Sequence, residues 1–174
     1  MESRHKRARI LAVRWLLYVV LLLCAAALQT TPGFLTIGDF KPFFIPAVCL
    51  AVSMYEGEFY GALFGAVGGL LWDYTGGRTV GLLAIMLLML CFFASVLVQL
   101  YLKPSWVNFF LINLAVGGIL LCMDFLFFYV MRGYDAPLRR FVTVVVPEVL
   151  VSAALSPLML RLAGWIHARW ALPE

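Results

Sequence analysis

Two carboxylates lie in strongly apolar sequence, where a charge is costly. Asp124 stands eight residues before Arg132, and Glu148 stands eight residues after Arg140. At a rise of about 1.5 Å per residue, two antiparallel helices joined by residues 132–140 would hold both carboxylates about 12 Å below that loop. Inserting an ionised side chain at the centre of a membrane helix costs about 2.5–3.5 kcal/mol, so such side chains usually face the interior of a helix bundle and contact polar partners there. The spacing therefore predicts a polar pocket near this loop.

Other polar side chains share these two helix faces. Asn113 lies on the face of Asp124, and Ser152 lies on the face of Glu148. We expect these four residues to form a buried polar cluster. One alternative is a structural cluster with one carboxyl protonated, because two close anions do not both ionise cheaply. Another is a recognition surface for a partner's membrane helix, or for a lipid-linked or small ligand.

Catalysis by the paired carboxylates is a third alternative. The intramembrane lipoprotein signal peptidase, an aspartyl peptidase, is of comparable size and also uses two acids. Its aspartates stand in Asn/Asp motifs that are absent from this sequence. Catalysis by Ser, His and Asp would need a histidine within a span, whereas His5 and His167 lie near the chain ends. No glycine-rich phosphate loop followed by Lys occurs. We therefore expect a protein that is not an enzyme and that has no cofactor.

The second pattern is a ladder of glycines with a spacing of four. Its positions are Gly57, Gly61, Gly65, Gly69, Asp73, Gly77 and Gly81. Residues four apart lie on one side of a helix, so the ladder predicts a groove that another backbone approaches closely. The groove would pack against helices of the same chain or against a partner. For Asp73, which ends the span, we expect a helix-end cap or an ion pair with Arg78.

The elements that position these residues must be membrane helices. Hydrophobic residues make up 64% of the 174 positions, where a soluble domain has roughly 45–50%. Only 13% are charged, against about 25% in soluble proteins. Six spans of about 20 residues would leave no contiguous stretch for a soluble catalytic domain. The chain is therefore predicted to be one all-α polytopic membrane domain, residues 1–174, made of about six transmembrane helices.

The predicted spans are residues 15–28, 43–55, 59–74, 81–102, 106–131 and 141–160. The second has 13 residues and would rise only about 20 Å, less than the ~30 Å hydrocarbon core. It packs as a partial span, or it is a re-entrant loop in a five-span protein. Residues 161–174 are predicted to form an interfacial tail because Trp165 and Trp170 flank basic residues.

The basic residues indicate orientation rather than nucleic-acid binding. Five of the thirteen Lys and Arg residues lie within the first 14 positions, ahead of an apolar run. This is the pattern of a cytoplasmic amino terminus. The four cysteines all fall in apolar stretches without a CxxC pair, which indicates small apolar fillers and neither a disulfide framework nor a metal site. They are Cys24, Cys49, Cys91 and Cys122.

The run GALFGAVGGLLWDYTGGRTVGLLAIMLL, residues 61–88, resembles the rod shape-determining protein MreD family, as does Lys41-Pro42 at the start of the short second helix. That family is similar in size, has a basic cytoplasmic amino terminus and has a glycine-spaced third helix. This third helix ends in Gly-Leu-Leu-x-Asp, which here corresponds to Gly69, Leu70, Leu71 and Asp73. Outside residues 41–88 the resemblance is compositional.

The resemblance implies a six-helix fold similar to the S components of energy-coupling-factor vitamin transporters. It also implies a place in the bacterial inner membrane, as a partner subunit in cell-wall elongation. The implied partners are the membrane-anchored scaffold MreC, the actin-like MreB, and the glycosyltransferase and transpeptidase that build side-wall peptidoglycan. A substrate-binding subunit of a vitamin-type transporter is the alternative, because the same fold would serve it.

Overall fold

The computed structural model describes residues 2–31, 33, 41–77, 81–101, 105–131, 133 and 137–171, which fold into helices with no strand among them. Four described stretches are long and apolar enough to cross a membrane, namely residues 7–30, 82–100, 106–130 and 138–169. The prediction of an all-α membrane protein is confirmed. The elements are α1 (Glu2–Thr30), α2 (Ile45–Glu56), α3 (Glu58–Thr75), α4 (Leu82–Leu100), α5 (Trp106–Phe125), the π-helix η1 (Leu126–Val130), α6 (Pro137–Arg140), the π-helix η2 (Phe141–Val145) and α7 (Val146–Arg169).

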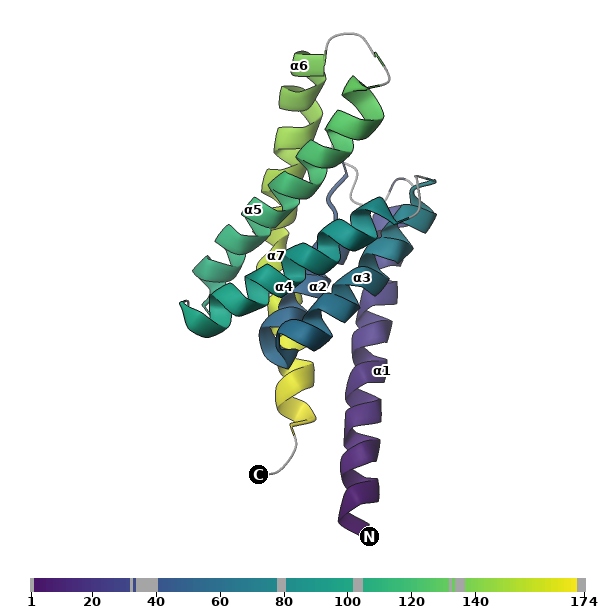
Figure 1. Cartoon of the computed structure of the whole chain (residues 1–174), viewed down its shortest axis with the longest axis vertical. Coiled ribbons are helices and arrows are strands. Elements are labelled where there is room, and N and C mark those ends of the chain that lie inside the picture. The colour runs from purple at the N-terminus through teal and green to yellow at the C-terminus, as the bar shows by residue number, and fades with distance from the viewer. Residues whose placement is uncertain are drawn as a thin grey trace.

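The long helices α1 and α7 run in opposite directions along the long axis of the molecule (Figure 1). The beginning of α1 and the end of α7 lie at the same end, which we call the terminal end. The helices α5 and α7 form a hairpin whose tip, with α6, lies at the opposite end, the hairpin end. The helices α3 and α4 cross in front of α2 as a tilted pair.

The short helix α2 forms the centre of the protein. Residues 43–53 are all buried, and the 12 residues of α2 rise only about 18 Å. Its start is held by side chains of two other helices. Gln29 Oε1, in α1, accepts the backbone N–H groups of Phe44 and Ile45 at 3.1 and 3.2 Å, and Ser152 Oγ, in α7, accepts that of Phe43 at 2.9 Å. These bonds satisfy backbone donors at the start of α2, which have no partner within the helix. By itself α2 is too short to cross a hydrocarbon core of about 30 Å.

The structure differs from the sequence prediction at both ends of the last span. The predicted tail continues α7 through Arg169 because its inner face packs on α2, where the ring of His167 stacks on that of Tyr55 at 5.3 Å. The predicted loop 132–140 is shorter, since Pro137–Arg140 is already helical. Arg132 lies outside the described residues.

Candidate functional site

The glycine face of α3 packs against α4 of the same chain. A Cβ atom on Gly65 would lie 2.8 Å from the carbonyl oxygen of Leu87 and 2.9 Å from Sγ of Cys91. A Cβ atom on Gly69 would collide with the backbone of Ala84. Both glycines are buried in the helix pair. Close approach of α3 and α4 therefore depends on the missing side chains.

The same face of α3 also meets α2. A Cβ atom on Gly61 would collide with Ser53, and one on Gly68 would collide with Sγ of Cys49. The helices α2 and α4 are themselves linked there, because the side-chain Oγ atom of Ser95 donates to the backbone carbonyl oxygen of Ser53 at 2.8 Å. A partner's helix would reach these glycines only by displacing α2 or α4.

The other ladder glycines lie outside the helices. Gly57 separates α2 from α3 with φ 90°, Gly77 follows α3 with φ 62°, and Gly81 precedes α4 with φ 109°. These left-handed conformations favour glycine because other residues carry a Cβ that clashes there. The glycine ladder is thus longer than the groove. In the structure the groove extends only from Gly61 to Gly69.

Asp73 joins the end of α3 to the start of α4. Its Oδ2 atom accepts the backbone N–H of Gly81 at 2.7 Å, and its side chain also accepts the N–H groups of Leu83 and Ala84 at 3.4 Å. Only 1% of Asp73 is exposed. A carboxylate is favourable at a helix N-terminus, where unpaired donors and the helix dipole meet. Asp73 therefore acts as a cap, while Arg78, its expected alternative partner, lies outside the described residues.

A buried ionic cluster at the terminal end was not predicted from the sequence. Glu56 Oε2 lies 2.8 Å from Nη2 of Arg14, and Glu56 Oε1 accepts the hydroxyl of Tyr18 at 2.8 Å. Nδ1 of His167 lies 3.0 Å from the same Oε1 atom. The side chains of Glu56 and Arg14 are only 6% and 10% exposed. One carboxylate at the end of α2 thus links α1 and α7.

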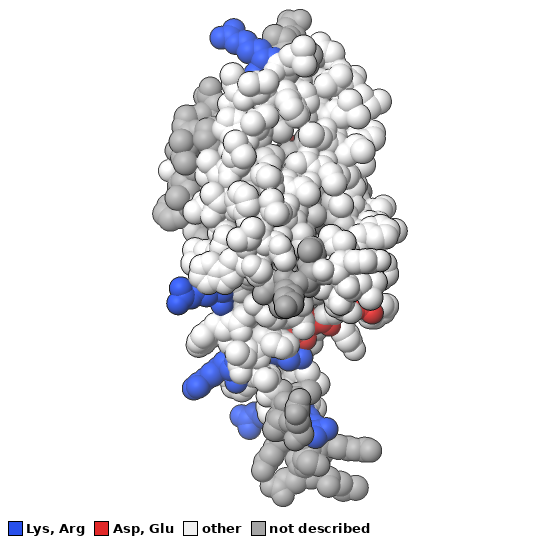
Figure 2. Space-filling model, turned by 90° about the vertical axis from the view of Figure 1, so that its left-hand side faces the viewer, with Lys and Arg blue, Asp and Glu red and all other residues white. Residues whose placement is uncertain are grey.

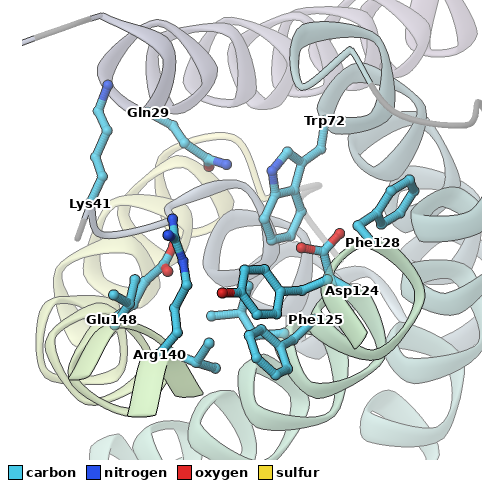
Figure 3. Close-up of a pocket in the computed structure, with 12 residues that line it drawn as sticks. Gln29, Lys41, Trp72, Asp124, Phe125, Phe128, Arg140 and Glu148 are labelled. Atoms are coloured by element: carbon cyan, nitrogen blue, oxygen red, sulfur yellow. The ribbon is translucent and has the colours of Figure 1, made fainter. Parts of the chain in front are cut away.

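At the hairpin end a cavity of about 370 Å³ opens beside α5 and α7. It contains both predicted carboxylates, Asp124 and Glu148, and Figure 3 shows them on opposite sides of the cavity, with Arg140 next to Glu148. We call it the hairpin cavity; its lining residues are Gln29, Lys41, Trp72, Leu121, Asp124, Phe125, Phe128, Tyr129, Arg140, Val144, Val145 and Glu148.

The two remaining members of the predicted cluster lie elsewhere. Ser152 accepts the backbone N–H of Phe43 and donates to the carbonyl oxygen of Glu148 at 2.6 Å, so it supports the start of α2. Asn113 is fully buried, and its amide has no hydrogen-bond partner within the part of the chain that the structure describes. It lies eleven residues before Asp124, about 16 Å along the helix. The cavity thus unites two of the four residues.

Comparison with known proteins gives a match to a family model. Neither a curated protein nor a solved structure matches the chain. The family model for rod shape-determining protein MreD matches residues 9–163, which include α2 to α6 and most of α1 and α7. The chain therefore belongs to the MreD family of rod shape-determining proteins.

Proposed function

We propose that this protein is a non-enzymatic membrane subunit of the cell-wall elongation machinery that binds the membrane-anchored scaffold MreC. Its family takes part in rod shape determination. The observation that carries the proposal is the extent of the match: it covers almost the whole helical fold rather than the glycine ladder alone. The glycosyltransferase, the transpeptidase and MreB would then join through the assembled complex.

The distribution of charge supports a place in the inner membrane with the amino terminus in the cytoplasm. Blue Lys and Arg side chains gather toward the terminal end in Figure 2, where the chain has Arg7 and Arg9 at the start of α1 and Arg161 and Arg169 in the last part of α7. Basic residues favour the cytoplasmic side of a membrane. The hairpin cavity would then open toward the outer leaflet.

The outer face of α5 is the contact surface that we propose for MreC. Small residues Ala115, Gly118 and Cys122 line a hollow of about 670 Å³ on this face. A Cβ atom on Gly118 would meet no atom within 4 Å, so no other described helix fills the hollow. Apolar side chains gain nothing by leaving lipid, so membrane helices associate largely through close van der Waals packing. Small residues allow that close packing. We assign the hollow to the single membrane span of MreC.

The experiment is co-purification from cells that lack their own MreD-family protein and contain tagged MreC. We expect the wild-type chain and the Ala154→Leu variant to co-purify with MreC and to keep the cells rod-shaped. We expect the Ala115→Leu variant to do neither. Both alanines are exposed, on α7 and α5 respectively, so the two variants are matched. Equal MreC recovery from both variants would refute the α5 surface. Failure of the wild-type chain to retain MreC would refute the function itself.

The hairpin cavity favours a second candidate function, the substrate-binding subunit of a small-molecule transporter with an S-component-like fold. A cavity of about 370 Å³ is within the size range of small-ligand sites. Stoichiometric retention of a vitamin-sized ligand by the purified chain, without MreC, would favour this candidate. We expect no such retention.

A further inference from the structure

The hairpin cavity is built almost entirely from residues of the candidate spans. Of its lining residues only Lys41 and Trp72 lie outside them. Both π-helices contribute, with Phe128 and Tyr129 from η1 and Val144 and Val145 from η2. Single π turns within helices are rare and occur frequently at functional sites. A ligand of this cavity would therefore be within reach of the membrane.

The charges of the lining balance. Two cations, Lys41 and Arg140, face two carboxylates, Asp124 and Glu148. A ligand with a net charge would leave one charge of the lining without compensation in a partly desolvated place, which is costly. A ligand with one positive and one negative group, or a neutral polar one, meets no such cost. The balance favours a zwitterion.

The two sides of the cavity also differ in net charge. Figure 3 shows Arg140 and Lys41 on one side, together with Glu148, which leaves one net positive charge there. Asp124 lies on the other side with Trp72 and Phe128. Aromatic faces next to a carboxylate attract an ammonium group. An Arg guanidinium and a Lys ammonium bind phosphate oxygens through charge-assisted hydrogen bonds. The cavity thus has a side for an ammonium group and a side for a phosphate group.

Arg140 is held in place for this role. Its guanidinium carbon lies 5.4 Å from the centre of the Tyr129 ring, and that ring stacks on Phe125 at 4.8 Å. Phe125 in turn meets the ring of Phe141 at 5.5 Å, edge to face. This aromatic stack connects both arms of the hairpin. It positions the guanidinium before a ligand arrives, which lowers the entropic cost of binding.

We propose that the hairpin cavity binds the phosphoethanolamine head group of a membrane lipid. The phosphate lies against Arg140 and Lys41, and the ammonium group lies against Asp124 and the aromatic side chains. The acyl chains remain in the bilayer. The proposal goes beyond MreC binding, which we place on the outer face of α5.

The test measures lipid bound to the purified, full-length chain by native mass spectrometry. The chain is incubated with equal amounts of phosphatidylethanolamine and phosphatidylglycerol. We expect phosphatidylethanolamine to be preferred about tenfold, the effect of one charge-assisted hydrogen bond or cation–aromatic contact. Asp124→Asn should abolish the preference, because only phosphatidylethanolamine has the ammonium group that Asp124 contacts. Arg140→Gln should weaken the binding of both lipids, because both have the phosphate group that Arg140 contacts. Equal binding of both lipids by the wild-type chain would overturn the proposal.

Arg139→Gln is the matched control, because Arg139 is exposed, adjacent to Arg140 and not part of the cavity lining. We expect it to bind both lipids as the wild type does, and a weakening of binding equal to that of Arg140→Gln would refute the site. A second arm adds free phosphoethanolamine as competitor. If free phosphoethanolamine displaces the lipid at equal concentration, the ligand of the cavity is a soluble zwitterion and not a membrane lipid. MreC recovery with Arg140→Gln should equal that of the wild type, which separates this proposal from the proposed function.

Discussion

The backbone of Ala84 in α4 lies directly against the Cα position of Gly69 in α3, at a separation that leaves no room for a methyl group. The neighbouring contact of Gly65 with the carbonyl oxygen of Leu87 is of the same kind. Helices in lipid gain stability from such close packing, since apolar side chains are equally well solvated by acyl chains. The α3–α4 pair is therefore held together by direct contact of the two backbones.

Gly69→Ala should destabilise the protein by about 1–3 kcal/mol, because an added methyl group forces the two backbones apart. The measurement is reversible unfolding in mixed detergent micelles. Gly118→Ala is a matched control, since Gly118 also follows a glycine within a helix but has open space where its Cβ would be. It should leave stability unchanged or raise it by up to about 1 kcal/mol. Equal effects of both substitutions would contradict the packing role of the ladder.

Glu56→Gln should cost about 3–5 kcal/mol, because it leaves the buried guanidinium of Arg14 without its counter-charge. The neighbouring substitution Glu58→Gln changes an exposed contact with Gln99 and should leave stability nearly unchanged. The same unfolding assay measures both. If the two variants lose stability equally, the cluster does not link α1, α2 and α7 as described.

Asp73→Ala should lower stability by about 1–2 kcal/mol through loss of the cap on α4. Asp73→Asn should lose less, because its amide oxygen still accepts the N–H of Gly81. Hydrogen exchange at Gly81, Leu83 and Ala84 locates the effect, and it should be faster in the Ala variant. Unchanged exchange at these amides in Asp73→Ala would show that the carboxylate is not their cap.

Asp124→Asn should leave the complex with MreC and rod shape intact, because we assign no catalytic step to this carboxylate. A peptidase that uses Asp124 as one of two acids would instead lose its activity, as general acid–base catalysis contributes typically 10²–10⁴-fold. Cell width and length, with MreC recovery from the same cells, provide the measurement. Loss of rod shape with unchanged MreC recovery would contradict this expectation and would show that the carboxylate has a role besides MreC binding.

Composition and periodicity were sufficient to predict membrane helices, and the glycine-spaced motif pointed to the family. That Asp124 and Glu148 line one cavity followed from simple counting, because helical rise converts spacing into distance. The ladder spacing, by contrast, predicted a close helix contact without identifying the helix. Any neighbouring backbone can pack against a helix face that lacks side chains, so the spacing does not show which helix does so. The structure shows that it is α4, at Ala84.

The ionic cluster around Glu56 was beyond prediction for a related reason. Arg14 and His167 lie 42 and 111 residues away in the sequence, and nothing local connects them. Asn113 was misplaced in the cluster because a shared helix face does not imply a shared depth. The π-helices also lack a signal in the hydrophobic pattern, yet they contribute four of the residues that line the hairpin cavity.

Site-specific photo-crosslinking tests the central claim, that MreC binds in the membrane on α5, most directly. A photo-reactive residue is placed at position 115 or, as control, at position 154, in cells that express MreC. We predict a covalent adduct with MreC from position 115 and none from position 154. Absence of the adduct at 115, or an equal yield at both positions, would contradict the account.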